Sequence, residues 1–253
     1  MKYIVTGGTG MVGMHLQEIM PDLVYLSSAD CDLTDKNAVD ALFASEKPDG
    51  VIHLAARVGG IMENIKNPAS FYDENIQINT NTLMAARKNG VKRLIAILST
   101  CMYPDKAVNY PMSEEDVHKG PPSAANFTYA YAKRCLAVQI DAYRHQHGLN
   151  YSYVIPCNLY GEHDNFEDSN KSHFVTALIK KIIDAENAGS TAITLFGTGK
   201  PMRQFMYTDI DKPDGQFRKD VGCGKMIADL GDFDFTSFED GIRKVYERLI
   251  TKG

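Results

Sequence analysis

The chain has 253 residues, 44% of them hydrophobic and 23% charged, which is ordinary for a globular protein with a sizeable core. A formal net charge of −5 argues against a nucleic-acid partner, because such a partner favours a basic surface. The opening "MKYIVTGGTG" does not read as a signal peptide, and no apolar window is long enough for a membrane span.

The five cysteines are odd in number and include no CxxC pair, and the seven histidines show no metal-binding spacing. This usage indicates neither a disulfide framework nor a metal site. We therefore expect a cytoplasmic protein that holds no metal and is not associated with a membrane.

Apolar runs alternate with amphipathic helical stretches through the first part of the chain. Strands are expected at 2–7, 22–27, 50–56, 92–100 and 151–161, and helices at 11–20, 35–46, 69–90 and 128–148. Short buried strands separated by helices are typical of a parallel sheet covered on both faces. The sequence thus predicts an α/β, doubly wound, Rossmann-like fold that binds ligands at the carboxyl ends of its strands.

The pattern changes after Gly161, where a polar loop runs over 162–172. The rest of the chain predicts a helix at 173–189, strands at 192–199 and 203–210, and an amphipathic helix at 237–250. These elements favour a small second lobe.

A glycine-rich turn, "VTGGTGMVG", joins the first predicted strand to the first predicted helix. Glycines let the backbone turn tightly and approach a pyrophosphate, which then faces the helix amino terminus. A plain tight turn is the simpler alternative, but the position between first strand and first helix favours a dinucleotide site. The expected cofactor contacts here are Gly7, Gly8, Thr9, Gly10, Met11, Val12 and Gly13.

The second predicted strand is followed by "DCDLTD", in which Asp32 can cap a helix, line the adenine site, or do both. No Lys or Arg occurs from Tyr3 to Asp35 to neutralise the 2′-phosphate of NADP. Ser27, Ser28 and Arg57 are possible donors to that phosphate, so the choice between NADP and NAD stays open.

The stretch "YAYAK" places Tyr129 and Lys133 four residues apart, on one face of a predicted helix. A lysine ammonium beside a tyrosine is expected to lower the pKa of the phenol, which normally lies near 10. Such a phenol can give a proton to a carbonyl oxygen near neutral pH. Alone, a YxxxK spacing is more often a solvated helix face.

Together with the glycine turn, this pair resembles the extended short-chain dehydrogenase/reductases. In that superfamily a Ser or Thr at the preceding strand end hydrogen-bonds the reacting carbonyl, and Ser99 of "LST" matches it. A closer resemblance is to the GDP-L-fucose synthase family. It runs from Met1 to about Asp209, resumes in "KPDGQFRK", and is carried by "HLAARVGGI", "STCMYPD", "NFTYAYAKR", "IPCNLYGEHDNF", "SHFVTALIKK" and "FGTGKPMRQF".

The resemblance implies an NADPH-dependent epimerisation at C3 and C5 and reduction at C4 of GDP-4-keto-6-deoxy-D-mannose. Cys101 and His173 match the family's proton-exchanging pair, and Ser99, Tyr129 and Lys133 complete the implied catalytic set. Protons beside a ketone are acidic because the enolate charge spreads onto the oxygen, which Ser99 and Tyr129 can stabilise. Without the resemblance, Cys101 would be taken as a core residue and His173 as a surface cap.

The resemblance also assigns binding residues. For NADP, with NAD as the alternative, it adds residues at or after strand ends, namely Asp32, Leu33, Leu54, Ala55, Ala56, Ile97, Leu98, Ser99, Pro156, Asn158 and Leu159. It also adds Tyr129, Lys133 and His173 from predicted helices. For the GDP-sugar it gives Lys181, Phe196, Arg203 and Asp214. Arg203 suits a diphosphate through paired hydrogen bonds, whereas Lys181 can equally be a solvated helix residue and Phe196 a core residue.

The sequence departs from the family in "MYTDIDKPDGQF", where several elements expected between "RQF" and "KPDG" are absent at Ile210/Asp211. Either an internal deletion or an omitted stretch explains this, and a true deletion would expose apolar sheet surface. We expect an NADP-binding domain over 1–161, to which 202–210 returns. A truncated substrate lobe is expected over 162–201 and 211–253.

Two further functions stay open: another nucleotide-sugar epimerase or dehydratase of the same superfamily, and a non-catalytic dinucleotide-binding protein left by the deletion. The resemblance also implies a homodimer paired through two long helices, here around 70–89 and 128–147.

Overall fold

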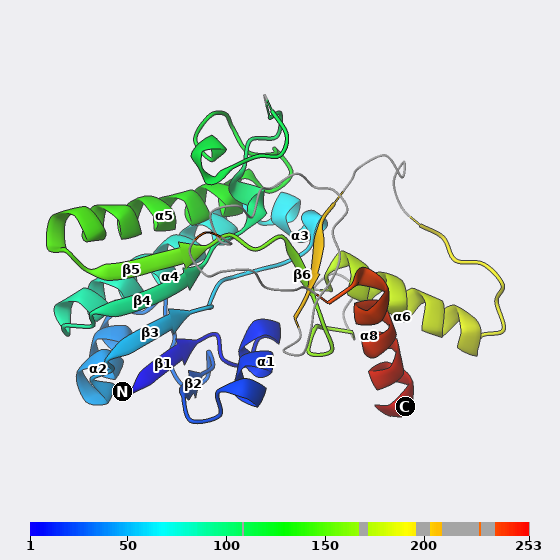
Figure 1. Cartoon of the computed structure of the whole chain (residues 1–253), viewed down its shortest axis with the longest axis horizontal. Helices are drawn as coiled ribbons and strands as arrows, with labels where there is room; N and C mark the ends of the chain where they lie inside the picture. Colours follow the sequence, from blue (N-terminus) through cyan, green and yellow to red (C-terminus); the bar gives the residue numbers. More distant parts are fainter. Residues whose placement is uncertain (108, 167–171, 196–202, 209–227, 229–235, 253) are drawn as a thin grey trace. The chain divides into compact units, whose positions relative to one another are not determined.

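The computed structural model describes residues 1–107, 109–166, 172–195, 203–208, 228 and 236–252. It divides the chain into two compact units. Unit 1 contains 1–107 and 114–156, and unit 2 contains 108–113 and 157–253. Each unit is described by itself (Figure 1).

Unit 1 is built on a parallel sheet of five strands, as the sequence predicts. The strands are β1 (Tyr3–Thr6), β2 (Val24–Leu26), β3 (Gly50–His53), β4 (Arg93–Ile97) and β5 (Asn150–Val154). Their order in the sheet is β2-β1-β3-β4-β5, and every pairing is parallel. The carboxyl ends of all five strands therefore lie along one edge.

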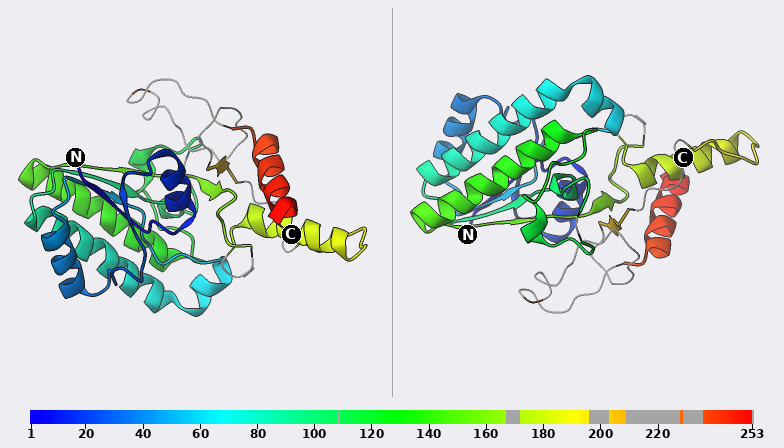
Figure 2. Two further views of the ribbon diagram at one scale, coloured as in Figure 1. Left: turned by 90° about the horizontal axis from the view of Figure 1, so that it is seen from below. Right: turned by 90° about the horizontal axis from the view of Figure 1, so that it is seen from above.

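Helices cover the two faces of this sheet, so the doubly wound prediction is confirmed. Figure 2 shows α2, α4 and α5 on one face and α1 on the other. The helices are α1 (Met11–Ile19), α2 (Lys36–Glu46), α3 (Ile61–Lys66), α4 (Pro68–Lys88) and α5 (Phe127–His147), with short 3-10 turns η1 (Thr100–Met102) and η2 (Glu114–Asp116). The local sequence sets their ends: the Asp35 carboxylate caps α2, and Gly148 closes α5 in a left-handed conformation.

The sheet face toward α5 is the better covered one. Ile4, Val51, Leu94 and Tyr151 lie there, each at most 2% exposed, and the Tyr151 ring lies 6.4 Å from that of Tyr143 on α5. This face forms the core of unit 1.

The opposite face is covered unevenly. Val5 on β1 is fully buried, but Ile95 on β4 and Val154 on β5 are each 37% exposed. In register, Val5 lies beside Ile52 and Ile52 beside Ile95. Coverage on this face therefore falls from the centre of the sheet toward β5.

Unit 2 contains a small parallel sheet of β6 (Asn158–Tyr160) and β7 (Phe205–Tyr207), and helices α6 (Phe174–Asn187) and α8 (Phe238–Lys252). Its buried core consists of Tyr160, Val175, Ile179, Tyr207 and Val245. The small unit thus has an apolar centre of its own.

Two strand predictions are wrong. The run 151–161 forms two strands in two sheets, because Pro156 has no N–H to continue the ladder; its carbonyl oxygen accepts from the Thr100 amide at 3.3 Å. Residues 192–195 of the strand expected at 192–199 are not extended into a sheet, and 196–199 lie outside the described residues.

Within the described part of the chain, none of the helices has the length and apolar content needed to span a bilayer.

Candidate active site

The glycine turn after β1 has the geometry that a dinucleotide pyrophosphate requires. Gly7 has a φ of +72°, and a Cβ on Gly13 would lie 2.4 Å from the Gly8 carbonyl oxygen. Both positions need glycine, because any side chain would displace backbone. A Cβ on Gly10 would meet only the Gly7 carbonyl oxygen, at 3.3 Å, so the free side of the turn lies at Gly10.

The start of α1 adds to this fit. Gly10 is its N-cap residue and supplies no side-chain acceptor to the first helical N–H groups. Those groups are suited to an anion, as is the positive end of the helix dipole. The remaining turn residues, Thr9, Met11 and Val12, follow in the same loop and first helical turn. The turn therefore fits the cofactor that the sequence predicts.

The other expected cofactor contacts in unit 1 follow the carboxyl ends of neighbouring strands. Asp32 and Leu33 follow β2, Leu54, Ala55 and Ala56 follow β3, Ile97, Leu98 and Ser99 end or follow β4, and Pro156 follows β5. The parallel order of the sheet brings these segments to one edge. Asn158, Leu159 and His173 belong to unit 2.

The polar groups after β2 are engaged with each other. The Asp32 carboxylate accepts hydrogen bonds from the Thr34 amide and hydroxyl at 2.9 and 2.7 Å, so it holds a turn, while Asp35 is the helix cap. The Ser27 amide and hydroxyl donate to Asp30 at 2.8 and 2.6 Å.

Arg57, a suggested partner for a 2′-phosphate, is held elsewhere in unit 1. Its guanidinium pairs with Glu74, lies 3.8 Å from Glu63 and stacks 5.0 Å from the centre of the Phe71 ring. The structure therefore gives both Arg57 and Ser27 partners within the protein.

Ser99 caps a 3-10 turn and also contacts Tyr129. It follows β4 and caps η1, its Oγ accepting a hydrogen bond from the Cys101 amide at 3.2 Å. The same hydroxyl hydrogen-bonds with the Tyr129 side chain. Ser99 thus joins the strand end, Cys101 and Tyr129.

Lys133 is buried beside this group. The residue is 2% exposed. Its ammonium donates to the Ile97 carbonyl oxygen at 2.8 Å and lies 5.8 Å from the centre of the Tyr129 ring. Burial lowers the pKa of Lys133 to about 8, against a smaller raising effect of the Cys101 charge. The structure therefore gathers Ser99, Cys101, Tyr129 and Lys133 at the end of β4.

The expected lowering of the Tyr129 pKa is wrong for this structure. Burial raises the pKa of Tyr129, a Cys101 charge raises it further, and hydrogen bonding with Ser99 lowers it. The low dielectric disfavours the phenolate more than the nearby groups favour it. Tyr129 is consequently a protonated phenol, which is the form that can donate a proton to a carbonyl oxygen.

In unit 2, His173 is the N-cap residue of α6. Its Nδ1 lies 2.9 and 3.0 Å from the two carboxylate oxygens of Asp164. The Asp164 side chain is only 4% exposed, whereas that of His173 is 44% exposed. Sequence reasoning did not single out Asp164, because one acid in a polar loop carries no spacing signal that points to a histidine nine residues later.

The expected substrate residues lie partly within the described chain. Lys181 is on α6 and donates to the Thr194 carbonyl oxygen at 3.2 Å, and Arg203 is exposed two residues before β7. Phe196 and Asp214 lie outside the described residues.

Comparison with known proteins finds one matching family and several named relatives. The model of the NAD dependent epimerase/dehydratase family matches residues 3–209. The chain is 42% identical over 222 residues to a probable GDP-L-fucose synthase of Drosophila melanogaster, covering 82% of this chain and 68% of the relative. It is 38% identical over 259 residues to the GDP-L-fucose synthase of Dictyostelium discoideum, covering 99% and 80%.

A solved structure is similar over nearly the whole chain. The GDP-L-fucose synthetase of Naegleria fowleri bound to NADP superposes with a TM-score of 0.86 at 32% identity, covering 99% of this chain and 92% of that one.

Proposed function

Because the chain belongs to the NAD dependent epimerase/dehydratase family and, within it, to the GDP-L-fucose synthases, we propose that it converts GDP-4-keto-6-deoxy-D-mannose into GDP-L-fucose with NADPH. The gathering of Ser99, Cys101, Tyr129 and Lys133 at the end of β4 is the observation that carries this function. It is an NADP-dependent oxidoreductase that also epimerises.

The residues divide the work as follows. The turn from Gly7 to Gly13 holds the pyrophosphate of the cofactor, which when bound supplies the hydride for C4. The Tyr129 phenol and the Ser99 hydroxyl bind the C4 oxygen, and Tyr129 gives it a proton. Lys133 places positive charge beside the phenol while that proton leaves.

Epimerisation uses the same carbonyl. Removing a proton from C3 or C5 moves charge onto the C4 oxygen, where Ser99 and Tyr129 stabilise it. We assign proton exchange at these carbons to Cys101 and His173. Lys181, Phe196, Arg203 and Asp214 are proposed to bind the GDP-sugar, with the Arg203 guanidinium gripping phosphate.

One assay tests the function. The protein is incubated with NADPH and GDP-4-keto-6-deoxy-D-mannose while the absorbance of NADPH and the sugar product are followed. Formation of GDP-fucose is expected. A different sugar product would support another nucleotide-sugar epimerase or dehydratase, and tight NADPH binding without turnover would support a non-catalytic dinucleotide-binding protein.

We propose an internal deletion at Ile210/Asp211 as well. The family match ends at residue 209, and Ile95 and Val154 are exposed on a sheet face that a complete fold would cover. The intact mass tests this directly: 28.1 kDa is expected, and a substantially heavier protein would mean that the segment is present.

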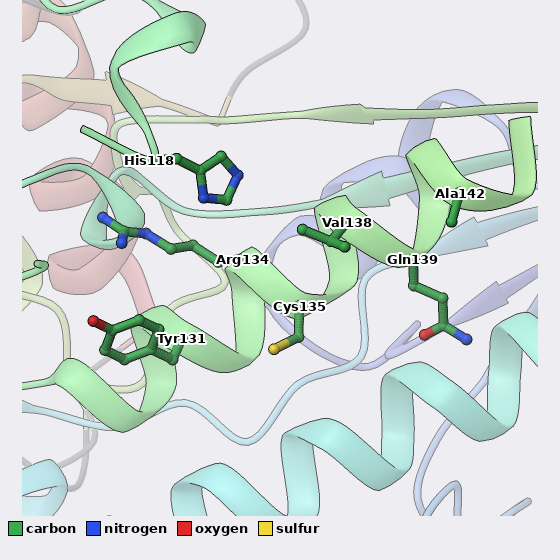
Figure 3. Close-up of a pocket in the computed structure, with 7 residues that line it drawn as sticks. All are labelled: His118, Tyr131, Arg134, Cys135, Val138, Gln139 and Ala142. Atoms are coloured by element: carbon green, nitrogen blue, oxygen red, sulfur yellow. The ribbon is translucent and has the colours of Figure 1, made fainter. Parts of the chain in front are cut away.

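A homodimer is proposed through α4 and α5. Their outer faces carry apolar side chains that are 37–54% exposed: Tyr72, Met84, Phe127, Tyr131 and Val138. A shallow cavity of about 370 Å³ lies along α5 between Tyr131 and Ala142 (Figure 3). Light scattering should give twice the chain mass, and Val138→Glu should give a monomer; a monomeric wild type would contradict the pairing.

We propose a cytoplasmic location because the cysteines that the structure describes are in the reduced, thiol form. Cys31, Cys101 and Cys135 are thiols rather than halves of disulfides, as a reducing compartment requires. Cell fractionation with the native chain tests it.

A further inference from the structure

Asp164 and His173 form a close pair in unit 2, nine residues apart in the chain. The imidazole Nδ1 lies 2.9 Å from one oxygen of the Asp164 carboxylate and 3.0 Å from the other. The carboxylate is 4% exposed and the imidazole 44% exposed. A buried acid therefore holds Nδ1 of a ring that stays partly exposed.

We propose that Asp164 is a positioning residue for catalysis: it binds Nδ1 of His173 and so directs Nε2 to exchange protons with the sugar ring. This inference rests on the proposed function, in which His173 exchanges those protons. An aspartate that holds a histidine in one tautomer and orientation acts in the same manner in hydrolytic triads.

The carboxylate is itself held in place by two further donors. The Thr176 hydroxyl, from the first turn of α6, donates to Oδ2. The Asn165 amide donates to Oδ1 at 2.8 Å. With His173, these donors engage both oxygens, so the carboxylate cannot rotate without losing hydrogen bonds. A fixed carboxylate fixes the ring that it binds.

The charges of the pair favour the protonated imidazole. Burial alone would raise the pKa of Asp164, but hydrogen bonds and the charge of His173 outweigh it and bring the value below normal. The hydrogen bond that His173 donates to Asp164 raises the pKa of His173, against burial. Among the described residues, Asp164 is the charged group that touches the His173 ring. His173 is thus suited to act as the acid that returns a proton to the ring carbon.

A purely structural role for Asp164 fits less well. The Asp164 carboxylate contacts the side chains of His173 and Thr176 and the amide of Asn165, and α6 has no side-chain cap within the described residues. The carboxylate therefore does not satisfy the free N–H groups at the start of α6, which a capping aspartate would do.

The first test uses the protein without substrate. The imidazole of His173, assigned by comparison with His173→Gln, is titrated by NMR in the wild type, Asp164→Asn and the control Asp184→Asn. Asp184 is matched because it is an aspartate on the same helix that pairs with Lys180. We expect a raised pKa in the wild type and in the control, and a lower one in Asp164→Asn. A wild-type value at or below the ordinary one, or equal values in all three proteins, would overturn the proposal.

The second test measures catalysis. Deuterium uptake by the sugar from heavy water should fall roughly 10²–10⁴-fold in Asp164→Asn, the range of a lost general acid or base. The pH profile of exchange should shift to lower pH, and Asp164→Glu should recover part of the rate. Undiminished exchange in Asp164→Asn would sink the idea. If the wild type does not turn over, the proposed function fails, while the titration still decides whether Asp164 controls His173.

Discussion

The Lys133 ammonium donates a hydrogen bond of 2.8 Å to the carbonyl oxygen of Ile97, the last residue of β4. This bond ties α5 to the strand that leads into Ser99. It places a buried cation beneath the Tyr129 phenol and fixes the distance between helix and strand end. The same contact thus serves the fold and, in the proposed mechanism, the reaction.

Replacing Lys133 with Met separates those two roles. Burying an ammonium costs free energy, and an apolar side chain of similar length avoids that cost, which offsets the lost hydrogen bond. Lys133→Met should therefore change the free energy of unfolding by no more than about 1 kcal/mol. Reduction should fall roughly 10²-fold, the scale of one lost electrostatic contact. Urea unfolding and stopped-flow hydride transfer measure the two effects, with the exposed Lys88→Met as control. If the free energy of unfolding fell by as much as the activation free energy of reduction rose, the two roles of Lys133 would not be separable.

Tyr129→Phe removes only the hydroxyl that is proposed to donate the proton. Reduction should decrease by roughly 10²–10⁴-fold, while NADPH affinity stays the same because the ring remains. Tyr131→Phe is a matched control, since Tyr131 lies two residues away on the same helix and is 40% exposed. A near-normal rate in Tyr129→Phe would rule out the phenol as the acid.

Cys101→Ser should block proton exchange at the sugar ring and spare NADPH binding. A serine hydroxyl is a far weaker acid than a thiol and cannot act as the base near neutral pH. Deuterium incorporation, read by mass spectrometry, measures the exchange. Cys135→Ser, an exposed thiol on α5, should behave as the wild type; full uptake in Cys101→Ser would remove Cys101 from the mechanism.

Acid should destabilise unit 1 through His53. This side chain is 1% exposed and hydrogen-bonds with Thr6 and Asn79 at 2.7 and 3.1 Å. Burial, with the charge of Lys133, lowers the pKa of His53 to about 4 from its ordinary 6.5, against the Asn79 hydrogen bond. Between these values the unfolded chain binds more protons than the folded one, so stability falls as the pH falls from about 6.5 to 4.

The expected loss between pH 7 and pH 5 is about 2 kcal/mol, from 1.36 kcal/mol per pKa unit. Urea unfolding at the two pH values measures it. His53→Gln should flatten this dependence, whereas the exposed His145→Gln should not. The same pH dependence in His53→Gln as in the wild type would show that another group is responsible.

Alanine at two glycines of the turn should have different effects. A Cβ on Gly13 meets two carbonyl oxygens at 2.4 and 2.6 Å, so Gly13→Ala should destabilise the fold by about 1–3 kcal/mol. A Cβ on Gly10 meets a single carbonyl oxygen, at 3.3 Å, so that a backbone shift of a few tenths of an ångström relieves the contact. Gly10→Ala should therefore be much less destabilising than Gly13→Ala but bind NADPH at least about tenfold more weakly. Unfolding midpoints and fluorescence titration with NADPH distinguish the two. Unchanged NADPH affinity in Gly10→Ala would contradict this placement of the pyrophosphate.

Much of unit 1 was predictable because its signals are local. The glycine turn, the YxxxK spacing and the alternation of apolar runs with amphipathic helices all lie within short windows. The sheet then follows from the rule that parallel strands need helical crossovers. The break at Pro156 was missed because apolar residues continue on both sides of it.

Other features depend on contacts between distant parts of the chain. The link between Asp164 and Thr176 forms only when Asp164 comes to lie against the start of α6. The raised pKa of Tyr129 results from burial, which a YxxxK spacing does not report. The roles of Cys101 and His173 stay predictions that rest on the family resemblance.

The partly bare flank at Ile95 and Val154 has a practical consequence for anyone handling this protein. β5 is the last strand on its side of the five-stranded sheet, so its outer amide and carbonyl groups lie next to uncovered apolar carbon. Strand edges of that kind recruit the edges of other molecules. We therefore expect the folded protein to associate through this flank at high concentration without first unfolding. Its solubility should fall in strongly salting-out buffers.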